Sequence, residues 1–233
     1  MKKSNRKFLL GASITAAFLL SSAAQAITVP GTANLFHGGN DFTGAGLGVE
    51  HWTLGDPAVL LGQFSGGTVI DIHAKGIIDF DINHSYGLSD PDGYYNGYAN
   101  TAMVLEPLNG GSGFYSGTLI GVWSTSNDPD NITPVGSSSV FVIGKNLSGL
   151  VAPTNPGGDS YLFAGIADQG WGDNSDGPFT HDGKTFSGVY DVTVTPVPLP
   201  ATLWLMGSGL LGLLGYRRFQ QRGEADEAGA AAA

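Results

Sequence analysis

The residues best suited to binding a ligand form one dense polar segment, Asp168-Gln169-Gly170-Trp171-Gly172-Asp173-Asn174-Ser175-Asp176-Gly177. Calcium takes oxygen ligands from carboxylates, amides and backbone carbonyls. Glycine leaves the backbone free to turn its carbonyl oxygens toward an ion, and Trp171 offers an aromatic ring on which a sugar can stack. The segment therefore predicts a loop that binds calcium and a carbohydrate. A polar turn that binds no ion is the alternative.

The motifs of common catalytic sites are missing. The chain has no Gly-x-Ser-x-Gly, no His-Glu-x-x-His, no phosphate-binding Walker loop and no cysteine. Most acidic residues fall in turns, where Asp caps local backbone groups. We expect the five histidines to be solvated rather than metal ligands: His37, His51, His73, His84 and His181. These observations favour a binding protein over an enzyme, and a hydrolase with two dispersed carboxylates is kept as an alternative.

The elements that must position this loop have the pattern of strands. Residues 70–75 and 78–83 alternate apolar with polar side chains, as a strand with one buried face does. Turn-forming Asp, Asn, Pro and Gly separate four shorter apolar runs: Thr118–Trp123, Ser139–Ile143, Tyr161–Ile166 and Val189–Thr195. No long 3.6-residue period and no internal repeat is present. The sequence predicts an all-β fold, an antiparallel β-sandwich of the jelly-roll or lectin-like kind, over residues 27–196.

The N-terminus has the pattern of a secretory signal peptide over residues 1–26. A basic start precedes an apolar run from Phe8 to Leu20, and Ala24-Gln25-Ala26 is a small-x-small cleavage site. We expect signal peptidase to cut after Ala26. A retained N-terminal anchor is the alternative, but the apolar run is shorter than the ~20 residues that a membrane span needs.

The C-terminal region has the pattern of a membrane helix. Leu199–Tyr216 carries no charge, and Arg217 and Arg218 follow it directly. At 1.5 Å per residue this run reaches about 27 Å, enough for a thin bilayer. Arginines on the cytoplasmic side place the preceding domain outside the cytoplasm. Residues 219–233 are predicted to form a disordered tail.

The same C-terminal residues resemble the PEP-CTERM sorting segment. The resemblance rests on a short motif, an apolar span and a basic pair, in that order: Val197-Pro198-Leu199-Pro200, then Gly207–Gly212, then Arg217 and Arg218. It implies that an exosortase, a membrane protease-transpeptidase of Gram-negative bacteria that make extracellular polysaccharide, recognises residues 197–218. The precursor would then be anchored in the inner membrane before delivery to the cell surface or extracellular matrix.

Charge separates the two ends from the body of the chain. The whole chain of 233 residues has a formal net charge of −10, whereas residues 27–196 hold three bases against seventeen acids, a net charge of −14. Phosphate binding needs Lys and Arg, so this balance excludes nucleic acid as a partner. A divalent cation is the small partner that an acidic surface favours, with an extracellular polysaccharide as the bolder expectation.

The body also resembles the PA-I galactophilic lectin family, a calcium-dependent β-sandwich. The similar segments are His84–Gly87, Asp90–Gly93, Val151–Pro153, Tyr161–Phe163, Asp168, Asp173-Asn174 and Ser187–Val194. The resemblance implies a calcium ion held by the Tyr86 carbonyl, Asp168, the Gly170 or Trp171 carbonyl, Asp173 and Asn174. It also implies that Asp90, Asp92 and Trp171 lie where a sugar would bind. A structural or adhesive matrix protein without specific sugar binding is the second hypothesis, and a polysaccharide hydrolase is the third.

Overall fold

The computed structural model describes residues 24–40, 55–80, 87–95, 98–99, 114–135, 140–168, 174–198, 206 and 209–213. A short 3-10 helix, η1 (His37–Gly39), accompanies the strands of the body, and Met206 and Gly209–Leu213 near the C-terminus are helical. The strands are β1 (Gln25–Pro30), β2 (Ala33–Asn34), β3 (Asp56–Pro57), β4 (Val59–Phe64), β5 (Val69–Lys75), β6 (Ile78–Asp79), β7 (Leu88–Ser89), β8 (Tyr94–Tyr95), β9 (Tyr98–Ala99), β10 (Leu119–Ser124), β11 (Phe141–Val142), β12 (Asn146–Val151), β13 (Ser160–Ile166), β14 (Phe179–His181), β15 (Lys184–Phe186) and β16 (Val189–Pro196).

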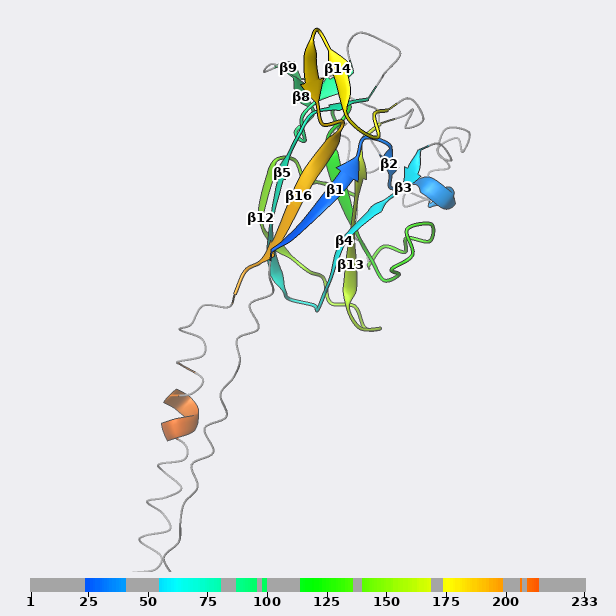
Figure 1. Cartoon of the computed structure of the whole chain (residues 1–233). Coiled ribbons are helices and arrows are strands. Elements are labelled where there is room, and N and C mark those ends of the chain that lie inside the picture. Colours follow the sequence, from blue (N-terminus) through cyan, green and yellow to red (C-terminus); the bar gives the residue numbers. More distant parts are fainter. Residues whose placement is uncertain are drawn as a thin grey trace, which may run out of the picture.

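Two four-stranded antiparallel sheets form the body, with strand orders β1-β16-β5-β12 and β11-β10-β13-β4. Side chains from both sheets meet in one core, to which β5 and β16 contribute Ile70, Ile72 and Val192, and β10 and β13 contribute Leu119 and Leu162. This arrangement confirms the predicted antiparallel, sandwich-type β fold (Figure 1).

The first sheet buries one face, as the alternation of residues 70–75 predicts. In β5, Ile70, Ile72 and Ala74 are buried, whereas the side chains between them are exposed or half-buried. In β16 the buried side chains are again every second residue, beginning with Tyr190. The unburied face of this sheet is open to solvent, which is why its strands alternate in polarity.

The two central strands of the second sheet, β10 and β13, are buried on both faces. All six residues of β10 are buried, and β13 has a single half-buried residue, Tyr161. One face packs on the first sheet, and the other packs under Leu35 and Phe36 of the segment that follows β2. Burial on both faces explains why these strands have the continuous apolar runs found in the sequence, instead of alternation.

The sequence patterns do not predict β4 and β12, because both strands are locally irregular. In β4 the register shifts opposite Leu162–Phe163, because Leu162 pairs with Gly62 and Phe163 with Leu60; in β12 it shifts between Leu147 and Leu150. These irregularities break the two-residue period on which the prediction depends.

The alternation of buried and exposed side chains predicted for residues 78–83 is wrong at Asp79. β6 spans only Ile78–Asp79, and Asp79 is buried rather than solvated. Its backbone N–H donates to Ser175 Oγ at 3.0 Å, and its carbonyl accepts from the Ser175 N–H at 2.7 Å. These bonds hold Asp79 inside the domain although its side chain is polar. Residues 81–86 lie outside the described ranges.

The first and last strands of the body lie side by side. β1 pairs with β16 from Gln25↔Val194 to Pro30↔Val189. The start of β1 and the end of β16 therefore meet at one end of the sandwich, the lower end in Figure 1, while β8, β9 and β14 lie at the upper end. Two residues of the predicted cleavage site, Gln25 and Ala26, belong to β1.

The predicted membrane helix falls mostly outside the described ranges. Of residues 199–216, Met206 and Gly209–Leu213 are described; they are helical and exposed. Within the described part of the chain, no helix has both the length and the apolar character that crossing a membrane requires. Residues 1–23 and the predicted tail at 219–233 are not among the described residues.

Candidate functional site at the upper end of the sandwich

A tight turn after β7 places two of the predicted sugar-contacting carboxylates. Asp90 Oδ1 accepts the backbone N–H of Asp92 at 2.9 Å and that of Tyr94 at 3.2 Å. Gly93 has φ +82°, a conformation that suits glycine. A Cβ at this position would also collide with Tyr115 and Thr118. The Asp-Pro-Asp-Gly stretch therefore forms a turn in which Asp90 is the cap.

Lys145 joins both carboxylates of this turn. Its Nζ lies 2.6 Å from Asp90 Oδ2 and 3.3 Å from Asp92 Oδ2, and its backbone N–H donates to Asp92 Oδ1 at 2.7 Å. The hydrogen bond to Asp90 raises the pKa of the Lys145 ammonium, and the bond to Asp92 acts in the same direction. Asp90 and Asp92 thus hold the turn to the start of β12, and their role in binding sugar stays a prediction.

Five aromatic rings lie in β8 or beside it, and none of them was predicted as a site residue from the sequence. Tyr94 packs edge-on against Tyr115 with 5.3 Å between ring centroids, and the hydrogen bond with Tyr115 raises the pKa of Tyr94. Tyr95 packs edge-on against Phe186 at 6.4 Å, and Phe186 stacks on Phe179 at 5.4 Å. Tyr115 is 36% exposed and the other four are half-buried. The available signal was the Tyr94-Tyr95 pair directly after a turn.

Tyr190 fixes the loops of this end to the core. Its side chain is fully buried, and its hydroxyl donates toward the carbonyls of Gly117 at 2.8 Å and Ser89 at 3.2 Å. Burial raises the pKa of Tyr190 well above its ordinary value. The Leu119 N–H in turn donates to the Pro91 carbonyl at 2.9 Å. One buried hydroxyl therefore ties the turn after β7 to the segment before β10.

Two of the predicted calcium ligands are described, and both are buried. Asp168, two residues beyond the end of β13, is 7% exposed, and Asn174 is 5% exposed. Asn174 Nδ2 donates to the Gly31 carbonyl at 2.8 Å. Its Oδ1 is buried and accepts no hydrogen bond from the described residues. The side chain is therefore held in place by its amide nitrogen, with an oxygen left for a further partner.

The other predicted ligands, Tyr86, Gly170 and Asp173, lie outside the described ranges, as does Trp171. Among the residues that the structure does describe, no three His, Asp or Glu side chains gather as a metal site would require. The calcium site thus stays a prediction for which the structure places two of five residues.

The described histidines make polar contacts at the surface. Nδ1 of His37 lies 2.6 Å from Asp130 Oδ1, and Nδ1 of His73 lies 2.7 Å from Asn146 Oδ1. His181 Nε2 is 3.5 Å from Asp182 Oδ2. Each histidine has one such partner on a different part of the surface. His51 and His84 are outside the described residues.

The end of β16 leads directly into a segment with a known relative. Residues 196–218 match the family described as the PEP-CTERM protein-sorting motif. This segment is a PEP-CTERM sorting motif. The prediction is confirmed, and the motif begins one residue earlier than expected, at Pro196 in the last position of β16. The PEP-CTERM motif indicates an exported protein whose C-terminal sorting signal is processed by an exosortase.

The remaining comparisons concern the whole chain. No curated protein matches it. Among solved structures, the chain is similar to one described as "EclA N-terminal domain; PllA-like lectin". The identity is 16%, the match covers 74% of this chain and 95% of that chain, and the TM-score is 0.33.

Proposed function

We propose that this protein binds carbohydrate outside the cell without catalysing a reaction, after an exosortase has processed its PEP-CTERM motif. The observation that carries the proposal is the group of aromatic rings and carboxylates at the end of the sandwich opposite the motif. An anchored precursor would present that end away from the membrane. The ligand we propose is an extracellular polysaccharide.

The aromatic rings supply the apolar part of such a site. Aromatic side chains combine a large apolar face with a polar tip in Tyr, which suits a ligand that has both C–H faces and hydroxyl groups. Tyr115 is the most exposed of the five rings. Asp90 and Asp92 lie in the adjoining turn, and Lys145 binds both of them; together they supply hydrogen-bond donors and acceptors. Such a surface suits a neutral or weakly charged glycan.

Two of the described residues support calcium as the cation in this proposal. Asn174 Oδ1 is a buried carbonyl oxygen without a hydrogen bond from the described residues, and Asp168 adds a buried carboxylate six residues earlier. Amide and carboxylate oxygens are the ligands that calcium prefers. Asp168 and Asn174 flank residues 169–173 in the sequence, and in this proposal both contribute oxygens to the same ion.

Removing an aromatic ring is expected to weaken glycan binding. Tyr115→Ala should lower the affinity for extracellular polysaccharide about tenfold, because it deletes the exposed ring and the partner of Tyr94. Binding can be measured by polysaccharide pull-down and glycan array with the secreted, processed protein. Val151→Ala is the control, since Val151 is a 55% exposed apolar residue of β12 outside this group. Equal binding by both variants and the wild type would contradict the proposal.

Calcium is expected to stabilise the protein through Asp168. Extracellular calcium modules have Kd values of about 10⁻⁴–10⁻³ M, so about 10 mM calcium should stabilise the fold by roughly 1.4–2.7 kcal/mol. Asp168→Asn should lose most of this gain in thermal unfolding. Asp90→Asn should keep it, because the Asp90 carboxylate binds Lys145.

Two outcomes would count against the calcium site. The first is a wild-type melting temperature that does not change with calcium. The second is glycan binding that survives chelation unchanged. Unaltered matrix retention of the Asp168 variant, together with normal folding, would favour a structural matrix protein.

A further inference from the structure

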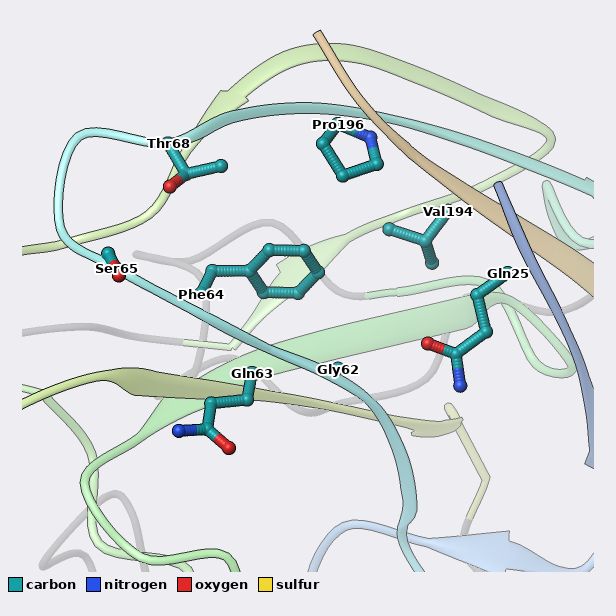
Figure 2. A pocket seen from close by; sticks show the side chains of 8 residues that line it. All are labelled: Gln25, Gly62, Gln63, Phe64, Ser65, Thr68, Val194 and Pro196. Atoms are coloured by element: carbon teal, nitrogen blue, oxygen red, sulfur yellow. The ribbon is translucent and has the colours of Figure 1, made fainter. Parts of the chain in front are cut away.

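A cavity of about 330 Å³ lies at the end of the sandwich from which the PEP-CTERM motif leaves. Figure 2 shows its lining, which comes from β1, β4, β16 and the turn between β4 and β5. None of the lining residues is charged: Gln25, Gly62, Gln63, Phe64, Ser65, Thr68, Val194 and Pro196. The cavity is thus apart from the acidic and aromatic surface at the other end.

Packing fixes the shape of the cavity wall on the β4 side. The Phe64 ring packs edge-on against Trp123, with 5.9 Å between centroids. It also lies over Gly62, where a Cβ would come within 2.7 Å of the ring. Gln63 Nε2 and Ser65 Oγ both donate to Asp159, at 2.7 and 2.8 Å. These bonds lower the pKa of the Asp159 carboxyl group and anchor both residues.

The opposite wall is formed by the end of β16, on the side of the strand that faces β1. On its other side β16 pairs with β5 as far as Pro196↔Ile70, and the Val197 N–H donates to the Val69 carbonyl at 2.8 Å. In an antiparallel sheet, successive residues direct their N–H and C=O groups to alternate sides. Since Val197 faces β5, the N–H and C=O of Val194 and the C=O of Pro196 face the β1 side; Pro196 has no N–H. Gln25, paired with Val194, is the residue of β1 that meets this part of the edge.

In the uncut chain, Gln25 and Ala26 cover this side of β16, and the expected cut after Ala26 removes them. Gln25 and Ala26 leave with the signal peptide, so the Val194 N–H and C=O lose their strand partner. The room taken by the Gln25 side chain opens as well, and the cavity grows on that side. A strand edge with free N–H and C=O groups is a template for another extended segment.

We propose that removal of the signal peptide uncovers a docking edge for the exosortase. An extended segment of the enzyme pairs with Val194–Pro196 and places one side chain in the cavity, where Gln25 lies in the precursor. The inference rests on the proposed processing of the PEP-CTERM motif by an exosortase. Such strand addition takes affinity from main-chain hydrogen bonds and specificity from pockets for alternate side chains.

Three observations favour the exosortase as the occupant. The PEP-CTERM motif begins at Pro196, so the edge and the processed segment are continuous. Leu199, the first residue of the apolar run, lies three positions after Pro196, a distance of about 10 Å at most. A membrane enzyme can therefore reach this edge while the precursor is anchored. The uncharged lining suits an apolar or amide side chain like that of Gln25.

The proposal fixes the order of the two processing steps. A precursor that keeps Gln25 and Ala26 has its docking edge covered, so it is a poor substrate for the exosortase. Signal peptidase must act first, and the exosortase then acts on the shortened chain.

The test keeps a Gln-Ala pair on β16 after signal peptidase has cut. Gln-Ala is inserted between Ala26 and Ile27 of the full chain, so that the mature protein begins with the two residues that pair with Val194 and Thr193. Loss of a tag fused after Ala233 is followed by pulse–chase in cells that carry the exosortase, and mass spectrometry checks each mature N-terminus. We expect roughly tenfold slower loss of the tag, because two backbone hydrogen bonds must be displaced.

A Gly-Gly insertion of equal length is the matched control. It adds no side chain for the cavity and pays a larger backbone entropy for pairing, so its tag loss should stay near the wild-type rate. Equal rates for all three chains, or equal slowing by both insertions, would overturn the proposal. A wild-type N-terminus that retains Gln25 would overturn it too. If the wild type never loses the tag, the exosortase processing itself is contradicted. A dimer that the Gln-Ala insertion dissociates, with unchanged tag loss, would assign the edge to a second copy.

Discussion

Deletion of residues 197–218 is expected to release the domain from the cell envelope as a soluble protein in the periplasm or medium. The deletion removes the apolar run and the basic pair of the PEP-CTERM motif. Pro196, the last residue of β16, stays in place, so the two sheets keep all their strands. Fractionation of cells into membrane, surface and soluble material measures the effect, and we expect nearly all of the truncated protein in the soluble fraction.

Deletion of residues 219–233 is the matched control for this result. It shortens the C-terminus but leaves the whole motif intact, so sorting should proceed. Retention of the 197–218 deletion at the wild-type level would contradict the role of the motif. Thermal unfolding of the purified truncated chain checks that it is folded, so that release can be told apart from loss by proteolysis.

Tyr190→Phe is expected to destabilise the fold by about 2 kcal/mol, or roughly 4–8 °C in the melting temperature. The substitution keeps the ring in the core but leaves the carbonyls of Gly117 and Ser89 without the hydroxyl donor. Thermal or urea unfolding measures the change. Tyr161→Phe is the control, since Tyr161 is a half-buried tyrosine of β13 and its loss of a hydroxyl should cost little.

The same substitution should change the response to alkaline pH. Burial raises the pKa of Tyr190 in the folded protein above the unfolded value, which is about 10. Its neutral form is favoured by folding, so its contribution is complete below pH ~10 and is lost as pH rises through the folded pKa. The wild type should therefore lose stability above pH ~10 more steeply than Tyr190→Phe. Parallel stability curves for the two proteins would show that the hydroxyl is not buried.

The sequence predicts those strands whose environment is uniform along their length. β5 alternates because one face is buried throughout, and β10 and β13 are continuously apolar because both faces are buried. β4 and β12 contain register shifts, and β1 begins inside the predicted cleavage site, so period and composition do not mark them. Local deviations in the backbone are thus the main reason for the missed strands.

The candidate site could be predicted only where its residues lie in one segment. Asp90 and Asp92 form a turn that their types and spacing indicate, and the structure adds Lys145, which lies far away in the sequence, just before β12. The ring pairs of Tyr94 with Tyr115 and of Tyr95 with Phe186 depend on contacts between separate loops. Such contacts follow from the topology of the sheets and cannot be read from the spacing of residues.

The pairing of the first strand with the last strand sets when this domain can fold. β1 lies at the edge of its sheet and has β16 as its sheet partner, so in a chain cut after Ala26 the contact joins Ile27 to Val192. Contacts between residues so far apart in sequence give a high contact order and slow folding. During export the N-terminal strand crosses the membrane first and must wait, unpaired, until the final strand has crossed. The sheet therefore closes only at the end of translocation, when the sorting motif itself reaches the membrane.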